Sequence, residues 1–496
     1  MEKTRTGVCG WVAFASLLAA FSLSLCLLDV RDADAIPAFG RKYNLTCNAC
    51  HTREPRLNPF GQRFQENGYQ MPATEEGGRT LKELLGGPVG GATLGQVTNF
   101  TAVRLRAEVR KAGFRETEDD KQEDFDVVFP KIINLFFAGT AARNISFFIE
   151  GEFNAEEEGS GLGFERVFLV FDNLGGYQLA NFKIGNFDPS AFYSFPTHRQ
   201  QLDPIPPDAE TDVFPPEIKR IPMLPFAFSS KMYGLTTGPA REGVEGFAIL
   251  PFEPFLFDVP ASKGATVYGR PFGPSFLYQV GVAQGDTAED SQDTRWDIYG
   301  MLRYDIVGPF SDVQVSGFYY HAQDAARPTL NPSGSATGPF VYAEPVDWDR
   351  FGVAARWHYK YLDIYGTGIW DWIGDVRFAG APGSLSKWDE DAFGLSVEAD
   401  WLVNRQWLLG ARYDFMDPGG LAELPPALQQ GGPKVNQDAS FLGVLAKFYP
   451  VPNIGLYARS HFNLAGSKKL PPGLGSAESP ARNLQYIASV GVDMAF

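Results

Sequence analysis

The sequence predicts an all-β fold, an antiparallel β-barrel of the outer-membrane type with about 16–18 strands. From about Gln96 to Phe496, apolar and polar residues alternate with a period of two over segments of about ten residues, and the polar face carries Arg and Glu. Aromatic side chains gather at the ends of these segments, as in Trp370–Trp372 and Tyr319–Tyr320. A soluble β-sandwich would also alternate, so the charged second face and the aromatic ends decide in favour of a barrel with a wet lumen and interfacial girdles.

The composition excludes three other classes of protein. Aromatic residues make up 14% of the 496 residues, which is too apolar for a disordered chain. Charged residues make up 21%, which is too many for a bundle of membrane helices. The formal net charge is −16 and there is no basic run, the opposite of what nucleic-acid binding requires.

The beginning of the chain has the features of a secretory signal peptide. Two basic residues precede an apolar run from Val8 to Leu28, and the stretch Ala33–Ala35 offers small residues for cleavage. We therefore expect residues 1–35 to be the signal peptide and the mature chain to begin at Ile36. Because the apolar run is long, a retained membrane anchor is the alternative.

The cysteines point to a covalent cofactor. Cys9 and Cys26 leave with the signal peptide, so that Cys47 and Cys50 remain, directly followed by His51. In an exported protein this CxxCH sequence predicts attachment of one haem c, because two thiols at this spacing add to the two vinyl groups and the adjacent imidazole becomes the proximal iron ligand. A zinc site would need two more ligands nearby, and a redox CxxC would normally lie in a larger βαβ unit.

The haem segment is predicted to span residues 36–92. It has few aliphatic residues, and a chain of this size buries too little surface to be securely stable alone, so we expect the macrocycle to complete its core. Met71, the segment's single methionine, is the candidate distal axial ligand of the iron. The alternatives are that Met71 is an ordinary apolar contact and that the iron has an open position or a ligand from elsewhere.

The remaining residues, 93–496, form the predicted barrel, in which short periplasmic turns should alternate with long outer loops. The predicted short turns are Gly139–Arg143, Asn173–Gly176, Gly238–Gly243, Val307–Ser311, Lys360–Leu362, Asn404–Gln406 and Pro450–Asn453. The predicted long loops are Ala112–Asp124, Asn154–Gly163, Asp188–Ser229, Gln284–Thr294, Gln323–Asp347, Asp375–Glu390, Asp417–Gln437 and Ala465–Arg482. The pattern needs one short strand near Lys263–Arg270, which gives about 18 strands, and about 16 is the alternative if one strand has been divided wrongly.

With an even number of strands, the first and the last strand of the barrel both have their free chain end on the periplasmic side of the outer membrane. We therefore expect the haem segment either at the periplasmic face or inside the lumen, within a hydrocarbon layer about 30 Å thick. A barrel of this size has a wide lumen unless something fills it.

Several other residues are candidates for binding. Alternation places His358 and His461 on the polar face, where they are either lumenal ligands or part of a solvated wall. His198 lies in the Pro-rich predicted loop, which either folds inward as a constriction or stays outside as a lid. The acidic runs Glu116–Asp126 and Glu156–Glu158 fall on predicted outer loops and would either concentrate cations such as ferrous iron or only solubilise the loops.

The order of a signal peptide, a CxxCH segment and a barrel that ends in Phe496 resembles the fused monohaem cytochrome–porins of iron-oxidising bacteria. The resemblance is carried by Ile36–Tyr43, Cys47–His51 and Pro55–Gly61, and by a last strand whose terminal Phe looks like the assembly signal of bacterial outer-membrane barrels. It implies an oxidoreductase of the outer membrane that oxidises extracellular Fe(II) and passes the electron through the haem to a periplasmic carrier, a small cytochrome or a copper protein. The alternatives are a solute-conducting porin with the haem segment as a plug or sensor, and a conduit for outward electron transfer.

Overall fold

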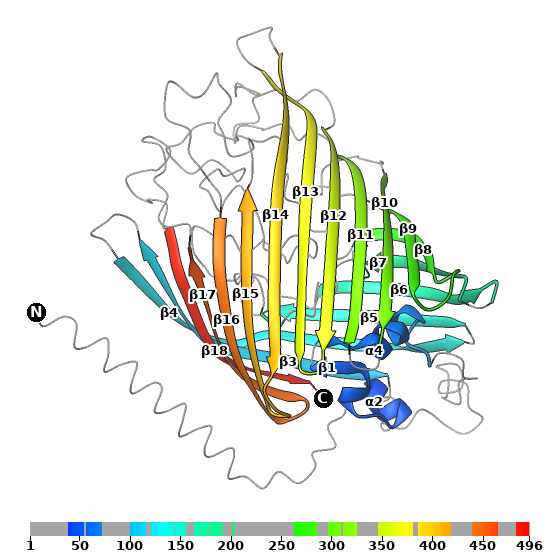
Figure 1. Cartoon of the computed structure of the whole chain (residues 1–496), viewed down its shortest axis with the longest axis horizontal. Helices are drawn as coiled ribbons and strands as arrows, with labels where there is room; N and C mark the ends of the chain where they lie inside the picture. The colour runs from blue at the N-terminus through cyan, green and yellow to red at the C-terminus, as the bar shows by residue number, and fades with distance from the viewer. Residues whose placement is uncertain are drawn as a thin grey trace, which may run out of the picture.

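The computed structural model describes residues 38–53, 56–71, 100–115, 121–142, 144–154, 163–176, 178–189, 192, 201–202, 262–284, 296–308, 311–324, 346–379, 385–417, 439–464 and 483–495. Within them, sixteen antiparallel strands form one closed barrel, with short helices at one of its ends (Figure 1). The predicted fold class is thereby confirmed, at the lower of the two strand counts. The predicted signal peptide lies outside the described residues, and so does the predicted boundary between residues 36–92 and 93–496.

The strands follow one another around the barrel in the order of the sequence, and β18 pairs with β3 to close it. The first eight are β3 (Thr101–Arg115), β4 (Lys121–Ala142), β5 (Ile145–Asn154), β6 (Gly163–Leu174), β7 (Ala180–Phe187), β8 (Ser262–Gly269), β9 (Phe276–Gln284) and β10 (Trp296–Val307). The last eight are β11 (Ser311–Asp324), β12 (Val346–Tyr359), β13 (Leu362–Ala379), β14 (Leu385–Leu402), β15 (Trp407–Asp417), β16 (Ala439–Val451), β17 (Ile454–Asn463) and β18 (Asn483–Ala495).

The strand count of 18 was wrong, because β7 is hydrogen-bonded directly to β8, with Ile184 opposite Ala265. No further strand of the described chain can enter the wall at this point. The short strand expected near Lys263–Arg270 is present as β8. It is followed by a tight turn at 270–275 that the sequence pattern did not predict. The predicted turn Gly238–Gly243 lies outside the described residues.

The other six predicted short turns each lie between the two described strands expected to flank them. Two predicted long loops were wrong, because β3 and β4 extend over most of Ala112–Asp124, and β13 and β14 extend over most of Asp375–Glu390. On β3 and β4 the polar residues are cross-strand pairs, such as Lys111 Nζ with Glu123 Oε2 at 2.8 Å. Such pairs stabilise a ladder as well as apolar pairs do, so charge was a poor marker of a loop.

The wall is apolar outside and polar inside, the reverse of a soluble protein. On β10, Leu302 and Ile298 are 58% and 51% exposed, whereas Arg303 and Asp305 are 6% and 3% exposed. Apolar side chains are favoured at such an outer face only in contact with lipid, and charged side chains are favoured at the inner face of a barrel. The described wall is therefore that of an outer-membrane barrel. None of the described helices is long and apolar enough to cross a bilayer.

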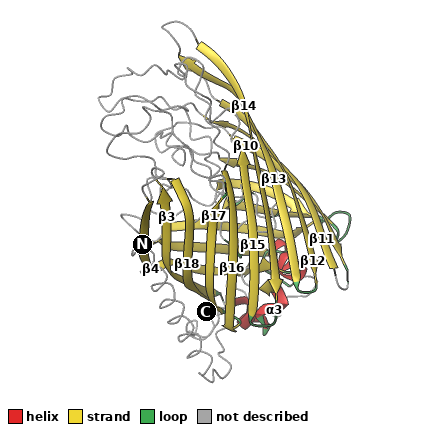
Figure 2. Cartoon of the chain, turned by 60° about the vertical axis from the view of Figure 1, so that its left-hand side comes forward, coloured by secondary structure: helices red, strands yellow, loops and turns green. Residues whose placement is uncertain are grey.

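The start of the described chain forms a small irregular unit, which we call the plug (residues 38–53 and 56–71). It contains α2 (Ala38–Tyr43), α3 (Cys47–Cys50), α4 (Pro59–Glu66) and a hairpin of β1 (His51–Arg53) and β2 (Arg56–Leu57). Figure 2 shows α3 at the end of the barrel where the C-terminus lies. The described wall residues that bond to the plug, such as Asp172, Arg270 and Gln314, are close to short turns, so the plug occupies the short-turn end of the barrel.

Candidate functional site

The two cysteines of the CxxCH sequence stand at the first and last positions of α3, one helical turn apart. Both are half-buried, and neither forms a disulfide in the described chain. His51 leaves the helix in an extended conformation, with φ −119° and ψ 141°. The structure thus brings Cys47, Cys50 and His51 together in one short turn.

Asn58 holds this turn against the next helix. Its side-chain amide donates to the carbonyl oxygens of Ala49 (2.9 Å) and Asn48 (3.2 Å), and its backbone N–H donates to the carbonyl of Cys50 (2.9 Å). At the same time its Oδ1 accepts the N–H of Gly61 at 2.9 Å, which caps the N-terminus of α4. One side chain therefore fixes both helices relative to each other.

Gly61 allows α4 to approach α3 closely. A Cβ at this position would lie 2.1 Å from the carbonyl oxygen of Cys50, a distance that no side chain tolerates. The backbone carbonyl of Cys50 is therefore covered by α4. This close approach explains why glycine follows Pro59-Phe60 in a helix that would otherwise disfavour it.

The donor set of the CxxCH turn fits a covalently attached haem. Two thiols on one turn and an imidazole at the next residue are the groups that c-type attachment uses. Burial raises the pKa of the Cys50 thiol, whereas a redox-active CxxC has a lowered thiol pKa. Among the described residues, no group of three or more His, Cys, Asp or Glu side chains is arranged to hold a metal ion.

The core of the plug is aromatic and continues into the barrel wall. The ring of Phe39 meets Phe64 edge-on at 5.1 Å between centroids and stacks on Tyr69 at 5.3 Å. Tyr69 in turn stacks on Phe148 of β5 at 5.2 Å, and Phe148 stacks on Phe168 of β6 at 5.3 Å. Because such contacts add to the burial of the rings, the wall supplies part of the core that the sequence alone left incomplete.

A pocket of carboxylates in the wall receives Arg56 of the plug. Its Nη2 lies 2.8 Å from Glu398 Oε1 and 2.6 Å from Asp400 Oδ2, and its Nη1 lies 3.6 Å from Asp363 Oδ2. The guanidinium carbon is 4.3 Å from the centroid of the Tyr365 ring. Burial by itself would lower the pKa of Arg56, but the surrounding carboxylates raise it above its ordinary value. We call these three carboxylates the acidic socket.

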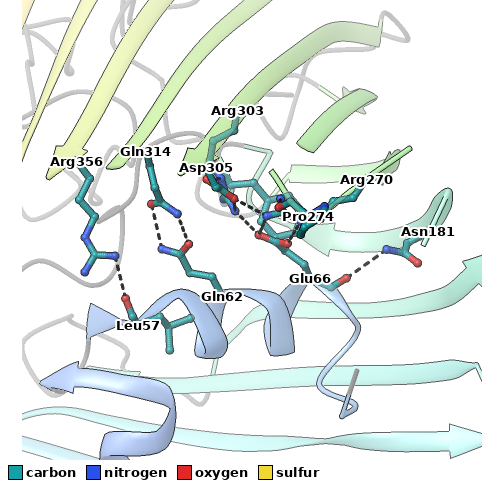
Figure 3. Close-up of polar contacts among 11 residues, drawn as sticks. Leu57, Gln62, Glu66, Asn181, Arg270, Pro274, Arg303, Asp305, Gln314 and Arg356 are labelled. Atoms are coloured by element: carbon teal, nitrogen blue, oxygen red, sulfur yellow. Dashed lines mark hydrogen bonds and ion pairs between the residues drawn. The ribbon is translucent and has the colours of Figure 1, made fainter. Parts of the chain in front are cut away.

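A basic socket receives Glu66 at the other end of α4 (Figure 3). Arg270 donates to Glu66 from Nε at 2.8 Å and from Nη2 at 3.1 Å, and Arg303 forms a second ion pair with the same carboxylate. Asp305 bonds both arginines, at 2.6 and 2.9 Å, so that two cations face two anions. Between the two sockets, the amides of Gln62 and Gln314 bond each other.

The plug is fitted tightly to the opposite wall as well. Gly68 has φ +63°, and a Cβ there would lie 2.2 Å from Ser146 Oγ and 2.4 Å from a carboxylate oxygen of Asp172. Gln70 donates to that same Asp172 at 2.8 Å. Both the left-handed backbone and the close approach require glycine at this position.

The remaining predicted site residues lie apart from the CxxCH turn or outside the described chain. Met71 follows α4 as the last described residue of the plug and is half-buried, and its role as a distal ligand stays a prediction. His358 and His461 face the lumen as predicted. His461 is buried, and His358 lies 3.9 Å from Asp363 of the acidic socket. His198 lies outside the described residues.

The acidic runs are only partly described. Glu156–Glu158 and residues 116–120 lie outside the described chain, but Glu123 and Asp126 belong to β4. Asp126 pairs with Arg110 at 2.9 Å and Glu123 pairs with Lys111. These carboxylates neutralise their neighbours on β3 and were wrongly placed on an outer loop.

Sequence reasoning missed the residues that hold the plug, above all Arg56 and Glu66. The available signal was a pair of opposite charges at either end of α4 in a segment with few apolar residues. Their partners are more than 200 positions away in the sequence. No spacing rule connects them, so only the closed barrel reveals the two sockets.

Comparisons with known proteins return folds only. No protein-family model matches the chain, and no curated protein matches it. Among solved structures, an anion-selective porin from Comamonas acidovorans is similar at 13% identity and a TM-score of 0.45, covering 80% of this chain and 99% of the porin. OmpF of Salmonella typhi in complex with daunomycin is similar at 12% identity and a TM-score of 0.44, covering 80% of this chain and 97% of OmpF. The outer membrane channel DcaP of Acinetobacter baumannii is similar at 10% identity and a TM-score of 0.44, covering 80% of this chain and 96% of DcaP. At these scores nothing further follows for this chain.

Proposed function

We propose that this protein is an outer-membrane redox conduit whose plug carries one c-type haem, attached to Cys47 and Cys50 and ligated by His51. The observation that supports this best is the position of the CxxCH turn, which is fixed inside the short-turn end of the barrel by buried ion pairs. When bound there, a c-type haem supplies a one-electron redox centre.

The chain's own residues would hold that centre in a defined place. Asn58 orients the turn that carries both thiols, and Arg56 and Glu66 fix the plug to two separate parts of the wall. The short-turn end of an outer-membrane barrel faces the periplasm. A small cytochrome or a copper protein in that compartment is therefore the proposed electron acceptor, and extracellular Fe(II) is the proposed donor.

The test measures haem attachment and its reduction separately. Mass spectrometry of the purified mature chain should show the added mass of one haem, and a Cys47→Ser/Cys50→Ser variant should lack it. Fe(II) added to the intact protein should shift the haem absorbance to the reduced spectrum. The double cysteine variant, treated in the same way, is the matched control.

Each result bears on a different part of the proposal. A mature chain without added porphyrin mass would refute the haem and with it the conduit. A haem that Fe(II) leaves oxidised at acidic and at neutral pH would refute Fe(II) as donor. A potentiometric titration of that haem then decides whether electrons flow outward to an extracellular acceptor.

A solute-conducting porin with the haem segment as a plug or sensor is the second candidate. The wall by itself favours it over the conduit, because a closed barrel of sixteen strands with a charged inner face normally leaves an aqueous channel. It predicts appreciable ion conductance of the intact protein in planar lipid bilayers. A sealed barrel would count against it.

A further inference from the structure

Described residues of the connection between β7 and β8 lie against two opposite sides of the lumen. We call its described residues 188, 189, 192, 201 and 202 the inward segment. Phe192 packs against Tyr268 of β8, with 4.8 Å between ring centroids. Leu202, ten positions later, is fully buried against the opposite side of the barrel, on β15, β16 and β17. It packs there with Leu408, Leu445, Tyr449 and Tyr457. The Pro-rich loop was expected either to fold inward as a constriction or to stay outside as a lid. The described residues of the inward segment lie inside.

On the β10 side, one arginine holds both the inward segment and the plug. Arg303 Nη1 donates to the carbonyl oxygen of Phe192 at 3.3 Å, and its Nη2 pairs with Glu66 of the plug. The start of the inward segment is held nearby, where Gln279 donates to the carbonyl oxygen of Pro189 at 3.1 Å. Movement of either the plug or the segment therefore takes a bond away from the same guanidinium.

On the β14 side, one carboxylate has the same double role. Glu398 Oε1 pairs with Arg56 of the plug at 2.8 Å and accepts the backbone N–H of Gln201 at 3.1 Å. Arg412 completes the arrangement, since it lies 3.6 Å from Glu398 and donates to the carbonyl of Leu202 at 3.0 Å. Arg56 is 1% exposed, and Glu398 and Leu202 are 0% exposed.

The inward segment also touches the plug directly. The side-chain amide of Gln201 donates to the carbonyl oxygen of Arg53 at 3.1 Å, two residues after His51. The guanidinium of Arg53 lies over the ring of Tyr449, 5.7 Å from its centroid, and Tyr449 is one of the residues that bury Leu202. Plug, segment and wall thus meet in one buried contact region.

We propose that the plug and the inward segment form one interlocked seal that closes the lumen to ions and solutes. Displacing the plug takes a charged partner from Arg303 and from Glu398, and displacing the segment takes a hydrogen bond from each of them, so the loss of either one weakens the hold on the other. The seal goes beyond the proposed redox function and does not require a haem. It predicts a lumen that conducts neither ions nor solutes, in contrast to the solute-conducting alternative.

The experiment measures conductance of the intact protein in planar lipid bilayers. Arg56→Met removes the plug's ion pairs with the acidic socket. Leu202→Asp places a charge in the apolar contact of the inward segment. The natural protein should show no appreciable conductance. Each single variant should raise the open fraction by roughly 100-fold or more, as expected when one partner of a buried contact is removed.

The double variant separates an interlocked seal from two independent ones. With interlocking, the double variant conducts about as much as either single variant. Single variants that stay closed, with only the double variant conducting, would refute the interlock. A natural protein that already conducts would refute the seal itself. Trypsin should also cleave the plug faster in Leu202→Asp, although that substitution is not in the plug.

Two controls separate these outcomes from misfolding and from the redox proposal. Glu150→Gln changes a buried carboxylate whose partners, Arg166 and Asn134, both lie on the wall, and it should stay closed. Heat-modifiable migration in gels shows whether each barrel is folded. Haem content is measured on the same samples, so a sealed protein without haem refutes the redox conduit and leaves the seal intact.

Discussion

The barrel wall and the plug are stabilised in different ways. Every wall strand is hydrogen-bonded to two neighbours, so the backbone of the wall is satisfied within the wall itself. The plug has three short helices and a two-stranded hairpin, the longest helix being the eight residues of α4. Its charged residues Arg56 and Glu66 find their partners on β10, β13 and β14 and in the turn that follows β8. We therefore expect the wall to be stable without the plug and the plug to depend on the wall.

This difference means that substitutions in the plug and in the wall should have separable effects. Loss of a charged partner between the plug and the wall should loosen the plug and the inward segment, while the hydrogen-bonded ladder of the wall stays intact. A lipid-facing substitution should instead act on the whole barrel, because the ladder closes on itself. The following predictions test that separation.

Glu66→Gln should have the largest effect. It removes the charge that faces Arg270 and Arg303, and loss of one partner from a buried ion pair destabilises by about 3–5 kcal/mol. Hydrogen–deuterium exchange of the α4 amides should accelerate, while exchange in the wall strands stays as it is.

Gln62→Ala is the matched control for Glu66→Gln. It removes only a neutral amide pair with Gln314, so the expected loss is about 1 kcal/mol. Equal acceleration of exchange in α4 and in the wall would mean that plug and barrel unfold together, against the separation drawn here.

Leu302→Lys should have the next largest effect, and on the wall. Leu302 lies near the middle of β10 and faces outward, where a lysine in the bilayer destabilises a barrel by about 2–4 kcal/mol. Urea titration of the protein folded into lipid vesicles should show this loss. Leu302→Phe, which stays apolar, should leave the midpoint nearly unchanged. A lysine variant as stable as the natural protein would show that this face does not meet lipid.

Apart from the control Gln62→Ala, Asn58→Ala should have the smallest effect, and it should act at the CxxCH turn. It removes an N-cap and two hydrogen bonds to the carbonyls of Asn48 and Ala49, which amounts to about 1–2 kcal/mol. The fraction of chains that carry attached haem should fall, with unchanged urea stability of the barrel. Asn58→Asp keeps the cap but loses the amide donors, so an intermediate value is expected. If every chain of the Asn58→Ala variant still carried haem, a positioning role of Asn58 would be contradicted.

The alternation of residues was sufficient to predict the wall. On β14, Glu398 and Asp400 alternate with Val397 and Trp401, and the structure has the first two buried on the inner face and the other two exposed on the outer face. The short turns with Asn and Gly could also be predicted, because these residues tolerate the backbone angles that tight turns require. The loop Ala112–Asp124 was misjudged because charged residues at the ends of β3 and β4 pair across the ladder, and a pattern of charge does not distinguish a paired strand from a loop.

By itself, the sequence determined the barrel and the CxxCH turn, because both depend on local spacing. A period of two sets which face of a strand a residue occupies, and three positions separate the two thiols whatever surrounds them. Only the tertiary structure decided where the turn lies and what holds it. Arg56 and Glu66 meet their partners through contacts between residues hundreds of positions apart, and closure of the barrel is what brings those residues together.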